Sequence, residues 1–255
     1  MRRLNTEKLL PRLLSKLDLS RRLLLLRPDV LRVALGGQNV ALYLGLRQPW
    51  LQRYQFRTVV DVGANVGQFA LLARKAFPGA ALHCFEPLPD CFAELGRRLG
   101  ETKGVTLHNF ALAEHDGVQP MTRNPYSPSS SLLEMTPSHV TAFPFTAGGD
   151  PVKVSVSTLD GALDGYAVDE PILVKIDVQG AEDRVIAGGQ SVLARATVAI
   201  VETSFEVLYR GQALFGEIHA SMRRLGFTYH GNLDQLTSPD DGRVLQGDAV
   251  FVRSE

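Results

Sequence analysis

The sequence has few of the features that mark exported, membrane-spanning or disulfide-stabilised proteins. Its two cysteines, Cys84 and Cys91, are too few for a disulfide framework and lack the paired spacing of a structural zinc site. No apolar run approaches the roughly 20 residues of a transmembrane helix. The longest run of the amino-terminal stretch, Leu23–Leu26, is bracketed by arginines, unlike the core of a secretory signal. A hydrophobic content of 45% also argues against disorder. We therefore expect a folded, cytoplasmic protein.

The sequence also lacks a net charge, but its charges are unevenly distributed. Its 255 residues include 27 bases and 27 acids, whereas residues 1–35 carry nine bases and three acids. This stretch therefore has a net charge of +6 and the remainder −6. Leucines at helical spacing predict a basic, helical amino-terminal arm over residues 1–56. The arm packs on the main domain or on a second copy of the chain, or it makes peripheral contact with an anionic membrane or an acidic partner. The acidic remainder disfavours nucleic acid as a substrate.

From residue 57 onward, short β-branched runs alternate with helical segments. Strands are expected at residues 58–62, 80–85, 105–108, 171–176 and 197–202, and in a closing antiparallel pair at 227–230 and 249–252. This alternation predicts an α/β fold with a doubly wound, mostly parallel sheet, in one domain over residues 57–255. Residues 124–151 depart from it because they contain five prolines and are expected to form an inserted loop. Residues 117–122 and 152–157 are expected to pair at its base.

The turn after the first strand lacks the third glycine of a dinucleotide-binding site. It contains only Gly63 and Gly67, with Asn65 between them, and it begins with Asp61 on the strand itself. The Gly-x-Gly-x-x-Gly pattern would place a pyrophosphate against the helix N-terminus. A carboxylate beneath the turn suits an ammonium group better, which favours an amino-acid-bearing nucleoside such as S-adenosylmethionine. A nicotinamide oxidoreductase is the alternative that this turn disfavours.

Polar residues follow the next strands at the same edge of the predicted sheet. Glu86 ends the second strand, where an acid can accept both ribose hydroxyls. Asn109 and Ala111, after the third strand, would border the adenine. Asp177 follows the fourth strand and can contact the cofactor and orient or deprotonate an acceptor hydroxyl, whereas the helix dipole alone can explain Glu182.

Several motifs, in order along the chain, resemble those of the FkbM family of S-adenosylmethionine-dependent methyltransferases. They are Asp61–Gly67, Phe85–Pro87, Asn109–Ala111, Ser129–Leu132, Ser157–Asp160, Lys175–Glu182, Glu202–Glu206 and Asp248–Val252. The resemblance covers residues 59–253 and implies a Rossmann-like class I methyltransferase fold with seven strands in the order 3-2-1-4-5-7-6. It implies O-methylation of a hydroxyl on a sugar, glycolipid or polyketide-type natural product. The family pattern places the cofactor against Asp61, Gly63, Asn65, Gly67 and Glu86.

Methyl transfer to a hydroxyl requires a base, and two residues are candidates. Asp177 is the first by its position, and His139 is the second because the insertion can close over an acceptor. A divalent metal on Asp177 and Glu202 is an alternative that we do not favour, because no Asp-Asp pair ends a strand, and we assign no metal ligand.

Aromatic side chains in two loops are expected to bind the acceptor. They are Tyr126, Phe143, Phe145, Phe205 and Tyr209. Such rings can stack on a sugar or pack against an apolar scaffold, although each is also explained by loop packing. The remaining alternative to an enzyme is a non-catalytic interaction module that assembles through the basic arm.

Overall fold

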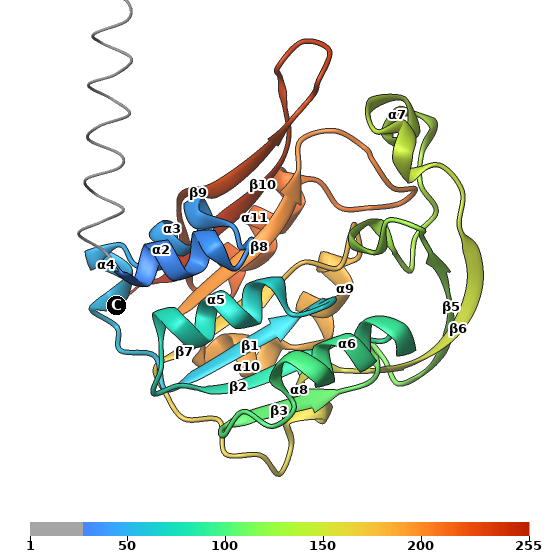
Figure 1. Cartoon of the computed structure of the whole chain (residues 1–255). Coiled ribbons are helices and arrows are strands. Elements are labelled where there is room, and N and C mark those ends of the chain that lie inside the picture. The colour runs from blue at the N-terminus through green and yellow to red at the C-terminus, as the bar shows by residue number, and fades with distance from the viewer. Residues whose placement is uncertain (1–27, 255) are drawn as a thin grey trace, which may run out of the picture.

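A seven-stranded sheet forms the centre of the protein (Figure 1), whose computed structural model describes residues 28–254. The strands are β1 (Thr58–Val62), β2 (Ala81–Phe85), β3 (Val105–His108), β7 (Ile172–Ile176), β8 (Val198–Ser204), β9 (Phe227–Thr237) and β10 (Val244–Arg253). Their order is β3-β2-β1-β7-β8-β10-β9, with β10 antiparallel to both of its neighbours. The predicted fold class and strand order are confirmed.

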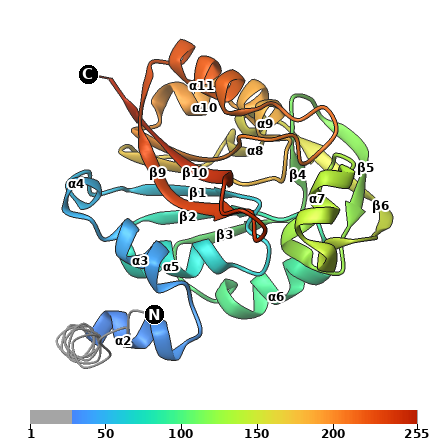
Figure 2. The same ribbon diagram turned by 90° about the horizontal axis from the view of Figure 1, so that it is seen from above.

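The sequence predicts the central strands because they are short runs rich in valine and isoleucine. Every residue of β1 and of β7 is buried, as expected for parallel strands that are covered on both faces. The helices α2 (Pro28–Leu35), α3 (Val40–Leu46), α5 (Gln68–Ala76) and α6 (Pro89–Leu99) cover one face (Figure 2). The helices α8 (Leu159–Leu163), α9 (Glu182–Gly188), α10 (Gln190–Arg195) and α11 (Phe215–Arg224) cover the other (Figure 2).

The closing hairpin, β9 and β10, is longer than predicted. The expected strands covered residues 227–230 and 249–252, but β9 continues to Thr237 and β10 begins at Val244. The added part extends beyond the other strands (Figure 1). It escaped prediction because it is rich in polar and exposed residues and therefore lacks the apolar pattern of a covered strand.

A second, three-stranded sheet lies at the base of the insertion. It consists of β4 (Ala111–Leu112), β6 (Asp150–Ser157) and β5 (Gly117–Arg123), in that order. The predicted strand pair is the antiparallel pair of β5 and β6. The insertion itself is not only loop, because it contains helix α7 (Pro137–Ala142) and two short 3-10 helices, η1 (Ser127–Ser129) and η2 (Pro144–Thr146).

The described part of the amino-terminal arm packs on the sheet. The helices α2 and α3 and the short helix α4 (Pro49–Gln52) bury Val33, Tyr43, Leu46 and Leu51 in the same core as α5. Residues 1–27 of the predicted helical arm lie outside the described residues. Between residues 28 and 254, no helix combines the length and apolar character that crossing a bilayer requires.

Candidate functional site

A cavity of roughly 500 Å³ opens at the carboxyl ends of β1, β2, β7 and β8. The insertion forms one wall, and the β9–β10 hairpin and the start of α3 form the opposite wall. Carboxyl ends of parallel strands are where α/β folds bind their ligands. The cavity therefore lies where the sequence places the site.

The turn between β1 and α5 is held against the turn that follows β7. Gly63 has φ 83°, and a Cβ atom on it would lie 1.9 Å from the carbonyl oxygen of Asp177. The amide of Asp177 in turn donates to the carbonyl of Val62 at 3.0 Å. Only glycine allows both this conformation and this approach. Gly63 therefore joins the two halves of the cavity floor.

Asn65 and Gly67 complete this turn in different ways. Asn65 lines the cavity at φ 49°, and its side-chain oxygen accepts hydrogen bonds from the amide of Val66 at 2.8 Å and the hydroxyl of Ser127 at 3.2 Å. Gly67 precedes α5, and a Cβ atom there would lie 3.0 Å from a methyl group of Leu95 on α6. Gly67 is not among the lining residues, so its visible role is helix packing.

Asp61 is a carboxylate that is buried beneath the turn and is not among the residues that line the cavity. Both of its oxygens are unpaired among the described residues. It lies on β1 directly beside Lys175 on β7. Burial raises the pKa of Asp61 to about 7, although the Lys175 ammonium acts in the opposite direction. Buried polar groups are normally paired, so the orphaned carboxylate suits a cationic ligand group.

Glu86 ties the end of β2 to the turn after β1. Its Oε1 accepts from the amide of Leu88 at 2.8 Å and its Oε2 from the amide of Asn65 at 2.9 Å. Burial raises the pKa of Glu86 to about 7, against the effect of these two amides. The carboxylate lines the cavity and is held by backbone groups.

Asn109 and Ala111, both predicted at the adenine, have different positions. The Asn109 amide donates to the carbonyls of Glu86 and Pro87, at 2.9 and 3.2 Å. Asn109 is not among the lining residues, whereas Ala111 lines the cavity together with Phe110. Asn109 therefore supports the Glu86 turn from behind.

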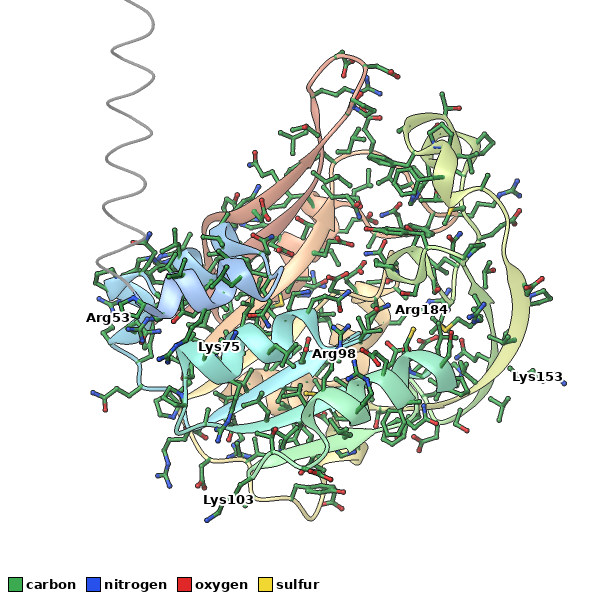
Figure 3. All side chains as sticks on the ribbon, viewed as in Figure 1. Arg53, Lys75, Arg98, Lys103, Lys153 and Arg184 are labelled. Carbon is green, nitrogen blue, oxygen red and sulfur yellow. The ribbon has the colours of Figure 1, made fainter. Side chains whose placement is uncertain are left out.

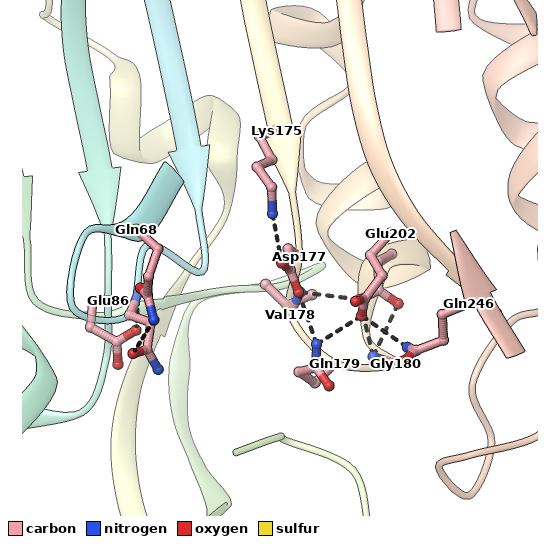
Figure 4. A network of polar contacts seen from close by, with 11 residues as sticks. Gln68, Glu86, Lys175, Asp177, Val178, Gln179, Gly180, Glu202 and Gln246 are labelled. Carbon is pink, nitrogen blue, oxygen red and sulfur yellow. Dashed lines mark hydrogen bonds and ion pairs between the residues drawn. The ribbon is translucent and has the colours of Figure 1, made fainter. Parts of the chain in front are cut away.

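A network of acids and amides connects β7, β8 and β10 (Figure 4). Asp177 accepts from the Lys175 ammonium at 2.6 Å and from the Gln179 amide at 2.9 Å. The same amide nitrogen donates to Glu202 at 2.8 Å, and the Gln246 amide donates to Glu202 at 3.0 Å. The sequence pointed to Asp177 and Glu202, but it gave no signal for the bridging role of Gln179.

The two carboxylates of this network differ in charge. Burial acts to raise the pKa of Asp177, but the Lys175 charge together with the hydrogen bonds from Lys175 and Gln179 holds this pKa below its usual value. The pKa of Glu202 lies well above its usual value, first because of burial and then because of the negative charge of Asp177. Asp177 is therefore the more acidic of the two, and Glu202 holds a proton more tightly than Asp177 does.

Gln179 and Glu182 shape the turn that carries Asp177. Gln179 has φ 58°, an uncommon conformation for a residue with a side chain, and its Oε1 accepts from the Tyr209 hydroxyl at 2.9 Å. Glu182 accepts from the amides of Val178 and Gly180, at 3.1 and 3.0 Å. The carboxylate of Glu182 thus stabilises its own turn.

His139 lines the cavity from α7 in the insertion. Its ring meets those of Phe143 and Tyr209 edge-on, with centroid distances of 5.7 and 5.1 Å. Its Nδ1 is buried and has no hydrogen-bond partner among the described residues. Burial lowers the pKa of His139, so the imidazole is neutral at pH 7.

Three of the five aromatic residues expected at the acceptor line the cavity. Tyr126 and Phe145 are exposed and meet edge-on at 5.2 Å, and Phe143 lies beside Phe145. Phe205 instead stacks on Phe215, and Tyr209 is fully buried beneath Gln179. Neither Phe205 nor Tyr209 is a lining residue, so for both the explanation as packing residues fits.

The cavity carries an excess of negative charge. Its acidic lining residues are Glu86, Asp177, Glu202, Asp234 and Asp248. Among the described lining residues, Lys175 is the only lysine or arginine. Lys103 and Lys153 project from the outer edge of the molecule (Figure 3). Within residues 28–254, no group of three or more histidine, cysteine or acidic residues is arranged to hold a metal ion.

Comparisons with known proteins agree on one family. The model of the methyltransferase FkbM domain matches residues 61–229. The 2-O-methyltransferase NoeI of Sinorhizobium fredii is 28% identical over 165 residues, covering 60% of this chain and 66% of NoeI. The 31-O-demethyl-FK506 methyltransferase FkbM of Streptomyces tacrolimicus is 27% identical over 204 residues, covering 70% of this chain and 75% of that protein.

A solved structure shares the fold. The methyltransferase FkbM of Methylobacillus flagellatus superposes with a TM-score of 0.50 at 13% identity. The match covers 82% of this chain and 47% of that chain, so this chain spans about half of that protein's length and just under two thirds of NoeI. Residues 28–60 and most of the β9–β10 hairpin lie outside the matched domain model.

Proposed function

This chain belongs to the FkbM methyltransferase family, and on this premise we propose that it is a cytoplasmic enzyme that methylates a hydroxyl of a small molecule or glycan with S-adenosylmethionine. The orphaned carboxylate of Asp61 is the observation that carries this proposal. A buried acid beneath a nucleoside-binding turn supports a ligand that brings a positive charge. The names of the relatives NoeI and FkbM specify O-methylation, which supports a hydroxyl as the acceptor.

The residues at the β1 end fit S-adenosylmethionine. Asp61 would receive its ammonium group, Glu86 its ribose hydroxyls, and Ala111 with Phe110 its adenine. Gly63 and Asn65 form the turn against which it would lie. When bound, S-adenosylmethionine supplies an activated methyl group on a sulfonium.

The residues at the other end fit a neutral hydroxyl compound. Asp177, kept ionised by Lys175, can accept a hydrogen bond from the acceptor and orient it. His139 is neutral and can accept a proton from the insertion side. Tyr126 and Phe145 offer exposed faces on which a sugar or an apolar scaffold can pack. Methyl transfer depends mainly on alignment and exclusion of water, and the walls of the cavity would provide both.

Calorimetry and label transfer test this function. We expect S-adenosylmethionine to bind and NAD not to bind. With tritium-labelled S-adenosylmethionine, label should pass to at least one acceptor of a panel of methyl hexosides, methyl 6-deoxyhexosides and a hydroxylated macrolide. Binding of NAD alone would favour an oxidoreductase, and binding of neither would favour a non-catalytic module. Binding without transfer to any hydroxyl would contradict O-methylation.

The basic arm supports a separate contact with an anionic membrane surface. Residues 1–27 contain eight bases and two acids. Full-length protein should sediment with phosphatidylglycerol vesicles and not with phosphatidylcholine vesicles, and Arg21→Glu with Arg22→Glu should weaken this binding. Equal binding to phosphatidylglycerol and phosphatidylcholine vesicles would contradict the proposal. A dimer in gel filtration that the same substitutions dissociate would instead assign the arm to an interface between copies.

A further inference from the structure

The strand register gathers carboxylates from three strands at the outer end of the cavity. Asp248 on β10 lies directly opposite Glu202 on β8 in the antiparallel ladder. Opposite residues of such a pair present their side chains on the same face of the sheet. Gln246, two positions before Asp248, shares this face and donates to Glu202 at 3.0 Å. Asp248 therefore belongs to the group of polar residues that contains Asp177.

The carboxylates of this group differ in how many of their oxygens already accept hydrogen bonds from side chains. Both oxygens of Asp177 are taken, by Lys175 and by Gln179. Glu202 receives two amide donors on one oxygen. Asp248 lines the cavity and makes no hydrogen bond or ion pair with another side chain among residues 28–254. Of these three, Asp248 is thus the carboxylate that an acceptor hydroxyl can approach at either oxygen without displacing a side-chain donor.

We propose that Asp248 is the catalytic base for the acceptor hydroxyl, an assignment that rests on the proposed function. The hydroxyl proton passes to the carboxylate of Asp248. The hydroxyl oxygen forms its new bond to the methyl carbon while the carbon–sulfur bond of the sulfonium breaks. The electron pair of that bond stays on sulfur, which leaves a neutral thioether. Asp248 then releases the proton to water.

The electrostatic surroundings of Asp248 suit this role. Burial raises the pKa of Asp248 to about 6, with Lys175 opposing the rise and Asp177 and Asp234 adding to it. Glu202, directly opposite on β8, also faces it. A base is most effective when its pKa lies near the working pH but leaves it ionised. Asp248 meets this condition, whereas the lowered pKa of Asp177 makes that carboxylate a weaker base.

His139 is the competing base. It approaches the cavity from the insertion, and burial lowers its pKa, which weakens it as a proton acceptor. The two candidates come from opposite walls and from different elements. Substituting each separately therefore distinguishes them.

The test measures kcat between pH 4.5 and 9 with tritium-labelled S-adenosylmethionine and the acceptor of the panel that reacts fastest. For Asp248→Asn, we expect kcat at pH 7.5 to fall about 100-fold or more. The acidic limb of the profile should disappear, and the Kd for S-adenosylmethionine should stay within about twofold. Asp248→Glu, which keeps a base, should retain an acidic limb. Asp183→Asn is the matched control, because Asp183 is a half-buried acid that does not line the cavity.

Other results would overturn the assignment. If folded Asp248→Asn kept the wild-type profile and rate, or if only His139→Gln removed the acidic limb, Asp248 would not be the base, while methyl transfer itself would stand. If the wild type bound S-adenosylmethionine and methylated no probe, the proposed function would fail and the assignment with it. Thermal unfolding of each variant separates a lost base from a lost fold.

Discussion

The two ends of the cavity hold their carboxylates by different means. At the β1 end, the backbone amides of Asn65 and Leu88 hold Glu86. At the β7–β10 end, the side chains of Lys175 and Gln179 hold Asp177. Backbone donors in a tight turn give a fixed shape, which suits a ligand that never varies. Side-chain donors and several neighbouring acids give the carboxylates at this end different pKa values, which suits the movement of a proton.

The strongest test of this comparison is to break the contact between the two ends. Gly63→Ala would place a methyl group 1.9 Å from the carbonyl oxygen of Asp177 and force an alanine to adopt φ 83°. We expect binding of S-adenosylmethionine to be lost and the free energy of unfolding to fall by about 3 kcal/mol. Calorimetry and urea denaturation measure the two effects.

Gly104→Ala is the matched control for this substitution. Gly104 also has a positive φ, 79°, but nothing lies within 4 Å of its added Cβ atom. Its free energy of unfolding should fall by only about 1 kcal/mol, because of the strained backbone, and it should bind S-adenosylmethionine normally. Equal losses in both variants would mean that the approach of Gly63 to Asp177 does not matter.

The sequence predicts a site at the β1 end from residues that are contiguous. Asp61–Gly67 joins a strand to a helix, and local chemistry alone suggests a cationic nucleoside ligand there. The same reasoning also proposes Gly67 and Asn109, which in the structure pack against Leu95 and support the Glu86 turn, because a motif shows that a residue is needed and not which neighbour needs it.

The β7–β10 end was less predictable because it depends on strand register. Asp248 meets Glu202 only through the β8–β10 pairing, and an aspartate within a strand carries no local signal of that neighbour. Gln179 bridges two acids from different strands for the same reason. The strand order followed from the family resemblance, whereas the length of β9 did not follow from its polar sequence.

Substitution of Asp61, the buried acid at the β1 end without a hydrogen-bond partner among the described residues, should have the next largest effect. Asp61→Asn should weaken binding of S-adenosylmethionine by between about 10- and 100-fold, the worth of a hydrogen bond to a charged group. Because the pKa of Asp61 is about 7 in the free protein, wild-type affinity should rise as pH increases from 6 to 8, when the acid ionises. The asparagine side chain of the variant cannot ionise, so this rise should become smaller.

Calorimetry of both proteins at pH 6, 7 and 8 checks this prediction. Asp169→Asn, at an exposed acid paired with Arg57, is the control and should behave as the wild type. The same affinity in wild type and Asp61→Asn at all three pH values would remove Asp61 from the cofactor site.

Glu182 tests the comparison from within the β7 end. Its carboxylate accepts hydrogen bonds from backbone amides, as the carboxylate of Glu86 does at the β1 end. Burial raises the pKa of Glu182 from 4.5 to about 7. The folded state therefore binds this proton more tightly than the unfolded state. Its contribution to stability is full below pH 4.5 and is lost as pH rises through about 7. Glu182→Gln should gain on the order of 2 kcal/mol relative to the wild type between pH 5 and pH 8.

Urea denaturation of the ligand-free protein at pH 5 and pH 8 measures that difference. The matched surface variant Glu170→Gln, at an exposed acid paired with Arg195, should show no such gain. A Glu182→Gln variant that follows the wild type at both pH values would mean that the buried acid does not keep its proton in the folded protein.

The smallest expected effect concerns the wall that lies outside the matched family domain. Leu42, on α3, lines the cavity, whereas Leu44 on the same helix is exposed and is not a lining residue. Leu42→Ala should raise KM for the acceptor by about fivefold, equivalent to about 1 kcal/mol of lost apolar contact, and leave the Kd for S-adenosylmethionine unchanged. Leu44→Ala makes the same chemical change and should alter neither. If Leu42→Ala changed the Kd for S-adenosylmethionine and not the KM for the acceptor, α3 would line the cofactor end of the cavity. The division of the cavity into a cofactor end and an acceptor end would then be wrong at this wall.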